Sequence, residues 1–560
     1  MLNLILSIII VILTIHGQGM LFNRIINLEK NYYKNFNETF IFGIIFLSFN
    51  ILLINFFLPI NRIISTIFLA TSLFYFFYNI YFSRFKKKYL KKIFILTIIT
   101  FFLLAFSTIN RPDAGLYHLP YISIINENKI IFGVTNLHFR FGHISIVQYL
   151  SSIFNSFILP KEAITIPLAL IFSSIIIFIF ESLKKQLKKD QFYLSIILFF
   201  FLIFSIYSYN RYSEYGNDAP SHLFFQLFII YIILQNKIDI HFFGKILLLS
   251  VYLFLIKPFM IVISPLVIYL FFKINKKKTF LSNRKLIFSL IFLMLWIIKN
   301  IITSGCLIYP ITKSCISKIV YLDLDKTKVE EIAGEAWSKD WINYKDKEFD
   351  IDSYNKKFRW VSTWSHNHLK VVMEKFGPFF LFLLIFNFIF YLNRDKNENI
   401  NKHLSNINNH IFLFFILLMT LIWFIKFPLY RFGSSILATF FIFATCSIIK
   451  KYSFFFKKKI IKKIINSTVI FAIILFSLKN FNRIFVNINK DTIWPQIYSL
   501  KDDLIKSPIK FEKIILNNDG HYFYSHGELC MYSRAPCTHI KLEDIHYSKK
   551  LNYFKMFYKN

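Results

Sequence analysis

Two carboxylates and one lysine stand where apolar segments end or are interrupted, and these residue types could do chemistry there. Asp113 and Asp218 each adjoin an apolar run, and Lys257 interrupts the apolar stretch 245–273. A charged lysine inside such a stretch is costly unless it is paired or used. A poorly solvated carboxylate becomes more basic, and a lysine nearby can bind a phosphate. These three residues are therefore candidates for general-base catalysis and anion binding.

Further polar side chains share this placement near the ends of apolar runs, where each could bind or orient an anionic substrate. They are His118 and Arg140 in the loop 110–144, Arg211 in the turn 209–218, and Lys299 in the run 285–302. Two plainer interpretations stand beside this one. Asp113 could be a loop carboxylate paired with Arg111, and Lys257 could extend its ammonium group to the membrane surface.

The composition predicts which elements must position these residues. Of 560 residues, 56% are hydrophobic and only 17% are charged, and the mean hydropathy is +0.51. Several apolar runs reach the roughly 20 residues that a helix needs to cross about 30 Å of hydrocarbon. Examples are 39–59, 62–82, 162–180 and 372–392. We therefore predict an all-α polytopic membrane protein with about fourteen transmembrane helices, in a range of about twelve to fourteen.

The basic residues predict the orientation of these helices. Four lysine-rich loops separate apolar runs, at 83–92, 181–190, 274–285 and 450–463. Basic loops of this kind stay in the cytoplasm and face anionic lipid headgroups. The same distribution argues against nucleic acid as a partner despite the net charge of +35, because the cations form short clusters between spans.

The topology is constrained further, because the chain must cross the membrane an even number of times between two cytoplasmic loops. Between the first two basic loops the chain leaves by 92–109 and returns by 162–180, so the apolar run 144–159 is not a further crossing. We expect that run to lie on the external face or to dip into it, as interfacial helices. The N-terminal run 2–16 lacks a basic flank and a small-residue cleavage site, and we predict that it is a retained span.

The predicted organisation is one membrane domain and one external segment. The membrane domain covers 1–479 and contains external loop one, 110–161, and a large external loop, 303–371. The C-terminal segment, 480–560, is expected to be external and small.

The cysteines fall on the predicted external side in two close pairs. Cys306 and Cys315 lie in the large external loop, Cys530 and Cys537 lie in the C-terminal segment, and Cys446 lies within a span. An oxidising compartment favours a local disulfide in each pair. The alternative is four free thiols without a structural role.

The large external loop holds four of the seven tryptophans, and their aromatic faces could stack on a sugar acceptor or form an interfacial belt. They are Trp337, Trp341, Trp360 and Trp364. His366 and His368 follow, but no matching set of metal ligands stands near them. No cofactor motif is present, and a divalent metal is left open.

Three stretches resemble the GT-C superfamily of membrane glycosyltransferases, over roughly 90–450 in arrangement. The first is Asp113 with YHLP at 117–120 in a large external loop. The second is W-x-x-K-N-x-x-x-x-G-x-x-x-Y-P from Trp296 to Pro310, similar to a stretch common in bacterial members. The third is YRFG at 430–433, which resembles a late arginine-containing segment of that group and makes Arg431 a binding candidate.

The resemblance implies a polyprenyl-phosphate-linked sugar as donor and a glycan, lipid or protein as acceptor. Asp113 would be the general base, and Lys257, Arg140 or Lys299 would stabilise the leaving phosphate. It also implies a bacterial inner membrane with the active face toward the periplasm. Many members have paired acids in the first loop, but Ala114 follows Asp113 here, which leaves Asp218 as the candidate second acid.

Two other functions are open at this point. One is an O-antigen-type polymerase or ligase, which also uses lipid-linked sugars but relies on arginines in a late external loop. The other is a lipid or glycan transporter (flippase), for which inverted repeats and polar residues along mid-span are typical. The sequence has neither feature, and its early loop holds the candidate base. The transferase is therefore the favoured interpretation.

Overall fold

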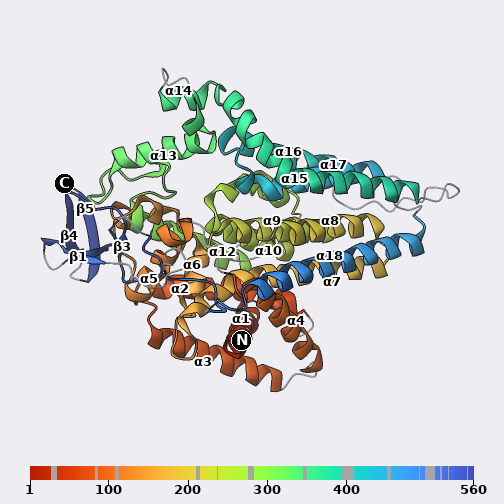
Figure 1. Cartoon of the computed structure of the whole chain (residues 1–560), viewed down its shortest axis with the longest axis horizontal. Coiled ribbons are helices and arrows are strands. Elements are labelled where there is room, and N and C mark those ends of the chain that lie inside the picture. The colour runs from red at the N-terminus through yellow and green to blue at the C-terminus, as the bar shows by residue number, and fades with distance from the viewer. Residues whose placement is uncertain are drawn as a thin grey trace.

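The computed structural model is dominated by helices that run along its long axis (Figure 1). It describes residues 1–26, 35–81, 86–107, 112–209, 215–235, 237–274, 283–344, 350–393, 409–450, 456–490, 492–498, 511–517, 520–526, 529–550 and 553–559.

Four helices form the N-terminal part: α1 (Leu2–Ile26), α2 (Phe36–Asn55), α3 (Arg62–Tyr81) and α4 (Lys86–Leu104). The first two approach closely because glycines face each other. A Cβ at Gly19 would lie 2.0 Å from the carbonyl oxygen of Thr39, and one at Gly43 would lie 2.2 Å from that of Ile15. Small residues allow such backbone proximity between membrane helices, where van der Waals packing drives association.

The central part begins with two short helices of external loop one, α5 (Leu119–Glu127) and α6 (Ile146–Ser152). The longer helices that follow are α7 (Ile166–Lys188), α8 (Phe192–Ser208), α9 (Asp218–Leu234), α10 (Ile240–Ile256), α11 (Ser264–Phe272) and α12 (Arg284–Ser304). All are rich in Phe, Ile and Leu, and burial of these side chains forms one continuous apolar core with the N-terminal helices.

The last part contains the helices α13 (Leu324–Ser338), α14 (Ile351–Lys356), α15 (Trp360–Leu392), α16 (Asn409–Lys426), α17 (Tyr430–Lys450) and α18 (Lys458–Val486). Helix α15 begins well before the predicted span 372–392, because its first turns pack in the large external loop.

The prediction of a helical membrane protein is confirmed at the level of its class. Within the described residues, eight helices are long and apolar enough to cross a membrane, and five shorter apolar helices accompany them. The eight are α1, α2, α3, α7, α12, α15, α17 and α18. The count of about fourteen crossings stays a prediction.

Ion pairs bring three of the four lysine-rich loops to one end of the helices. Lys92 lies 2.8 Å from Glu181, and Asp190 lies 3.3 Å from Lys458 and 2.7 Å from Lys462. The C-terminal strands and α13 lie at the opposite end, on the left of Figure 1. The helices therefore separate a basic end from an end that carries the predicted external loops.

The run 144–159 contains only the seven-residue helix α6, which at 1.5 Å per residue is far too short to cross a bilayer. All seven of its residues are buried. The structure agrees with the prediction that this run is not a further crossing, and its place on or within the external face stays a prediction.

The C-terminal segment contains β-structure that the sequence analysis did not predict. Strands β1 (Glu512–Ile515), β2 (His521–Tyr524) and β3 (Cys537–Thr538) form one sheet, and β4 (Ile545–Lys550) pairs with β5 (Phe554–Lys559). Phe132 of external loop one forms a parallel bridge with Met556 of β5. The C-terminal segment is therefore docked on external loop one.

Candidate functional site

Asp113 directly precedes the turn Ala114–His118 of external loop one, and Arg140 binds it. The turn Ala114–His118 follows with π-helical geometry and leads into α5. Nη1 of Arg140 donates a hydrogen bond to Oδ1 of Asp113. Arg140 belongs to a 3₁₀ turn, Phe139–His143, later in the same loop. The pair therefore joins two parts of external loop one.

Asp218 is the first residue of α9, and Lys257 is its partner. Lys257 stands at the break between α10 and the 3₁₀ turn Pro258–Ile263, and its Nζ donates a hydrogen bond to Oδ1 of Asp218. The side-chain amide of Asn217 donates to the carbonyl oxygen of Ile256 at 3.2 Å. This bond holds the start of α9 against the end of α10, so the ion pair has a fixed frame.

Arg431, in the first turn of α17, stands between the two carboxylates. Its Nη1 lies 3.6 Å from Oδ2 of Asp113, and its Nε lies 3.9 Å from Oδ2 of Asp218. Positive and negative charges thus alternate along one row of five residues, which we name the charged cluster: Arg140, Asp113, Arg431, Asp218 and Lys257. Five separate segments of the chain contribute one residue each.

The charged cluster is accessible and carries one more cation than anion. The exposed fractions of its side chains run from 10% for Lys257 to 37% for Arg431. Nε of Arg431 is itself buried and has no hydrogen-bond partner among the described residues. A free guanidinium donor beside a surplus positive charge suits an anionic ligand.

Aromatic rings border the cations of the charged cluster. The ring of Phe432 lies 3.7 Å from Nζ of Lys257, and the guanidinium of Arg431 lies 5.0 Å from the ring of Trp337 on α13. Tyr117 lies under Arg140 at 5.6 Å. Burial, together with the nearby Asp113 carboxylate, raises the pKa of Tyr117, so its phenol is neutral. Cation–π contacts of this kind orient a guanidinium while they leave its edge free.

His222 holds the backbone that carries Arg431. Its Nε2 donates to the carbonyl oxygen of Arg431 at 2.7 Å, and its Nδ1 lies 2.7 Å from Oγ of Ser435. This residue was not predicted from the sequence, although a histidine within the apolar helix α9 is a signal for a buried polar contact.

His118 lies beside the charged cluster and contacts neither carboxylate through a hydrogen bond. Its Nδ1 lies 3.1 Å from the side-chain amide of Gln148, which also donates to the carbonyl oxygen of Tyr215 at 3.3 Å. Burial lowers the pKa of His118 to about 4, so the ring is neutral at pH 7. His118 therefore links external loop one to the segment that precedes Asp218.

Lys299 is outside the charged cluster. It is fully buried on α12, where its Nζ donates to Oδ1 of Asn300 at 3.3 Å and lies 4.5 Å from the ring of Trp296. No carboxylate pairs with it in the described part of the chain. The structure does not bring Lys299 together with the other cations, because its ammonium group lies near Tyr121 of external loop one, and its role toward a phosphate stays a prediction. Arg211 lies outside the described residues.

Three of the four tryptophans of the large external loop pack together and do not form a sugar-stacking surface. Trp360 and Trp364 are buried with Tyr354, and Trp341 packs against them. Trp337 alone among the four borders the charged cluster.

The histidine pair of this loop does not form a metal site in the described structure. His368 lies 3.5 Å from Oδ1 of Asp340. Across the residues described, no group of three or more His, Cys, Asp or Glu side chains could hold a metal ion.

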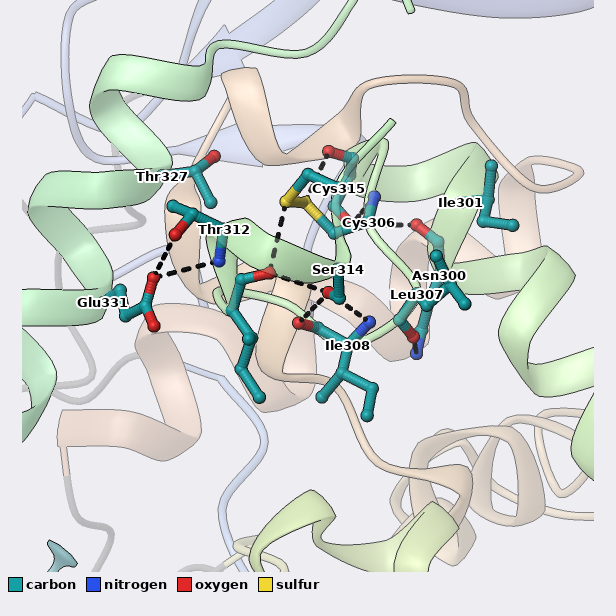
Figure 2. Close-up of a disulfide and its surroundings, with 12 residues drawn as sticks. Asn300, Ile301, Cys306, Leu307, Ile308, Thr312, Ser314, Cys315, Thr327 and Glu331 are labelled. Carbon is teal, nitrogen blue, oxygen red and sulfur yellow. Dashed lines mark hydrogen bonds between the residues drawn. A yellow bond between two sulfur atoms is a disulfide. The ribbon is translucent and has the colours of Figure 1, made fainter. Parts of the chain in front are cut away.

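Both predicted cysteine pairs are disulfides in the structure. Cys306 is bonded to Cys315, and Cys530 is bonded to Cys537, while Cys446 is free and buried. Figure 2 shows the first disulfide between the end of α12 and the loop that leads to α13.

Polar contacts beside this disulfide tie the same loop to α13. Backbone N–H and Oγ1 of Thr312 donate to Oε2 of Glu331 at 2.9 and 2.6 Å (Figure 2). Because Glu331 and Trp337 are on the same helix, these contacts also fix the helix that covers Arg431.

A comparison with curated proteins finds no match, and neither does one with solved structures. One family model does match, that of "Domain of unknown function (DUF8201)", over residues 1–438. The matched range includes all five residues of the charged cluster. The chain therefore belongs to this family.

Proposed function

We propose that the protein is a membrane glycosyltransferase that acts at the end of its helices opposite the lysine-rich loops. It takes a sugar from a polyprenyl-phosphate donor and transfers it to a glycan, lipid or protein acceptor. The observation that carries this proposal is the charged cluster, in which two carboxylates alternate with three cations at the ends of membrane helices.

The three cations supply the site for the donor phosphate. Arg431 and Arg140 can each offer two parallel N–H donors to phosphate oxygens, and Lys257 adds a compact positive charge. Nε of Arg431 already lacks a hydrogen-bond partner within the described chain. A headgroup phosphate held here would keep its polyprenyl chain in the membrane, because the cluster stands where apolar helices begin or end.

Asp113 supplies the base. It removes the proton from an acceptor hydroxyl while the hydroxyl oxygen forms a bond to the anomeric carbon of the sugar. The bond between that carbon and the phosphate oxygen breaks, and polyprenyl phosphate leaves with the electron pair. The cations stabilise the charge that develops on the leaving phosphate. Attack from the opposite side inverts the anomeric configuration.

Donor binding would also release this base from its ion pairs. In the structure, Asp113 is paired with both Arg140 and Arg431. A phosphate that binds these guanidinium groups takes the place of the carboxylate at one or both. The donor would thus free Asp113 at the moment when the reaction needs it.

The proposal includes a topology. About fourteen crossings would place the charged cluster, external loop one, the large external loop and both disulfides toward the periplasm of a bacterial inner membrane. The ion pairs that join three lysine-rich loops at the opposite end support this arrangement.

An O-antigen-type polymerase or ligase is the second candidate, and Arg431 favours it. This arginine comes late in the chain and contacts both carboxylates, and such enzymes rely on late external arginines. The two candidates differ in their donors, because the transferase takes a sugar on a polyprenyl monophosphate and the polymerase or ligase takes a glycan on a polyprenyl diphosphate.

The test replaces Asp113→Asn in the native membrane. We expect the surface glycan to lose one sugar and the polyprenyl-phosphate-linked sugar to accumulate in lipid extracts measured by mass spectrometry. Asp325→Asn is the matched control, because Asp325 is exposed on α13 of the large external loop and outside the cluster. An unchanged glycan at normal protein abundance would remove Asp113 from the mechanism. Accumulation of a diphosphate-linked glycan would select the second candidate.

A further inference from the structure

The C-terminal segment reaches the loop that carries Asp218. Its first part is held just after α4, where the backbone N–H of Phe106 donates to the carbonyl oxygen of Ile493 at 2.8 Å. The phenol of Tyr215 donates to the carbonyl oxygen of Gln496 at 2.9 Å, and this tyrosine is 3% exposed. Tyr215 stands three residues before Asp218, so the contact fixes the approach to the start of α9.

The same segment reaches the turn that carries Asp113. The backbone N–H of Met531 donates to the carbonyl oxygen of Gly115 at 3.0 Å. A Cβ at Gly115 would lie 2.4 Å from Sδ of Met531 and 2.9 Å from Cβ of Leu529, so these two segments of the chain are in direct contact. Met531 has φ +52°, a left-handed conformation that costs a non-glycine residue energy. A methionine in this conformation indicates that the packing of its buried side chain compensates for the backbone strain.

Two contacts continue along α5. Oγ of Ser123 donates to the carbonyl oxygen of Ser533, and the backbone N–H of Ala535 donates to Oε2 of Glu127 at 3.0 Å. Burial raises the pKa of Glu127, whereas the Ala535 N–H opposes this shift by stabilising the carboxylate. The helix directly after the Asp113 turn is thus bound at two of its residues.

Tyr532 adds three hydrogen bonds to this interface. Its phenol donates to Oδ1 of Asn126 at 3.0 Å and accepts from the side-chain amide of Asn155 at 2.8 Å. Its backbone N–H donates to the carbonyl oxygen of Ile497 at 2.9 Å. The last bond joins the part of the segment at Asp218 to the part at Asp113.

The disulfide Cys530–Cys537 closes the loop that makes the contacts with external loop one. Both sulfur-bearing residues are buried, and the residues between them include Met531, Tyr532 and Ala535, which are also buried. A closed loop has fewer conformations to lose when it orders, so its contacts hold their geometry at a lower entropic cost.

We propose that residues 492–498 and 529–537 are positioning elements of the site, which hold the Asp113 turn and the Asp218 loop at the spacing that Arg431 bridges. Within the described chain, neither element forms a hydrogen bond or ion pair with a side chain of the charged cluster, and both contact the segments that carry it. Displacements of about 1 Å at reacting groups can reduce rates on the order of a hundredfold. The effect on catalysis rests on the proposed function, whereas the effect on the geometry does not.

The first test is hydrogen exchange of backbone amides, measured on the full chain in lipid nanodiscs. Tyr532→Phe removes two hydrogen bonds and keeps the ring, so it preserves packing. We expect amides of 112–127 to exchange about tenfold faster, the factor that loss of one to two net hydrogen bonds implies. Ile540→Ala is the control, because Ile540 is 42% exposed on the same segment.

The second test uses two separate variants. Cys530→Ser/Cys537→Ser removes the disulfide. Met531→Gly deletes only the side chain, and glycine suits the left-handed backbone at this position. Both variants should speed exchange in 112–127 and leave α7 and α10 unchanged. Unchanged exchange in 112–127, or a uniform increase over α7 and α10, would overturn the proposal.

The catalytic consequence is measured on the same variants. We expect the transfer rate kcat to fall at least about tenfold at an unchanged donor KM, because the phosphate-binding cations stay in place. A loss of donor affinity with an unchanged rate would contradict a positioning role. If wild-type protein transfers no sugar from any polyprenyl-phosphate donor, the proposed function fails, and the exchange measurement still decides this inference.

Discussion

Nη1 of Arg431 lies 3.6 Å from Oδ2 of Asp113, although 317 residues separate the two along the chain. The same guanidinium reaches Asp218, so one side chain at the start of α17 connects external loop one with the start of α9. This geometry makes Arg431 both a partner of the candidate base and the donor group best placed for a phosphate.

Arg431→Lys tests that double role. Lysine keeps the charge but has no planar fork, so it cannot contact both carboxylates and a phosphate together. We expect the KM for a polyprenyl-phosphate sugar to rise about ten- to a hundredfold, the loss that one charge-assisted hydrogen bond implies. Initial rates over a range of donor concentrations measure it. An unchanged KM would show that the donor does not contact Arg431.

Lys257 and Asp218 form the least exposed ion pair of the cluster, with Lys257 10% exposed. Lys257→Met leaves Asp218 without its hydrogen-bonded partner, and Asp218→Asn leaves a buried ammonium. Removal of one partner is costly when the other stays buried, and we expect about 1–3 kcal/mol for each change because Asp218 is 32% exposed and solvent screens it.

The double variant Lys257→Met/Asp218→Asn should cost less than the sum of the single changes, because neither charge is then left alone. Denaturation of the protein in nanodiscs, followed by tryptophan fluorescence, gives the four free energies of unfolding. Additive effects would mean that the two groups do not interact.

The sequence alone was enough to find the class of protein and most of the cluster. Apolar runs and lysine-rich loops predicted a helical membrane protein, and charged residues at the ends of those runs identified Asp113, Asp218 and Lys257. Such residues are visible because burial of charge is expensive and rare.

Contacts that depend on helix packing could not be predicted in the same way. Lys299 resembled Lys257 in its placement, yet its ammonium group lies near the rings of Trp296 on the same helix and Tyr121 of external loop one. The role of His222 depends on α17 lying beside α9, which no local pattern encodes. The strands of the C-terminal segment were missed because runs of two to six residues do not stand out in a chain with 20% aromatic residues.

Acid should loosen external loop one through His138. Burial lowers the pKa of His138 to about 3, and the neighbouring groups, His539, Arg140, Lys326 and His143, add to that shift. The unfolded chain takes up a proton near pH 6.5 and the folded chain does not. Stability is therefore complete above pH 6.5 and is lost as pH falls toward 3. We expect a loss of about 2 kcal/mol between pH 7.5 and pH 5 from this residue.

His138→Asn is the test of that pH dependence. Its side-chain oxygen can accept the hydrogen bond that Nδ1 of His138 now accepts from the backbone N–H of Arg140, and it does not titrate. The free energy of unfolding at pH 7.5 and pH 5 should differ less in this variant than in the wild type. Equal differences would mean that His138 is protonated in the folded protein.

Trp337 should govern how Arg431 is held. Its ring lies 5.0 Å from the guanidinium and is 45% exposed, so the contact contributes only about 0.5–1 kcal/mol to stability. Trp337→Ala frees the side chain of Arg431, and the entropy of ordering it then opposes donor binding. We expect the donor KM to rise about three- to fivefold, the factor that a contact of this size implies, with little change in the free energy of unfolding.

Trp337→Phe should restore most of the affinity, because it keeps an aromatic face. Val329→Ala, at an exposed position on the same helix, should leave KM unchanged. If Trp337→Ala and Val329→Ala behave alike, α13 covers the cluster without orienting it.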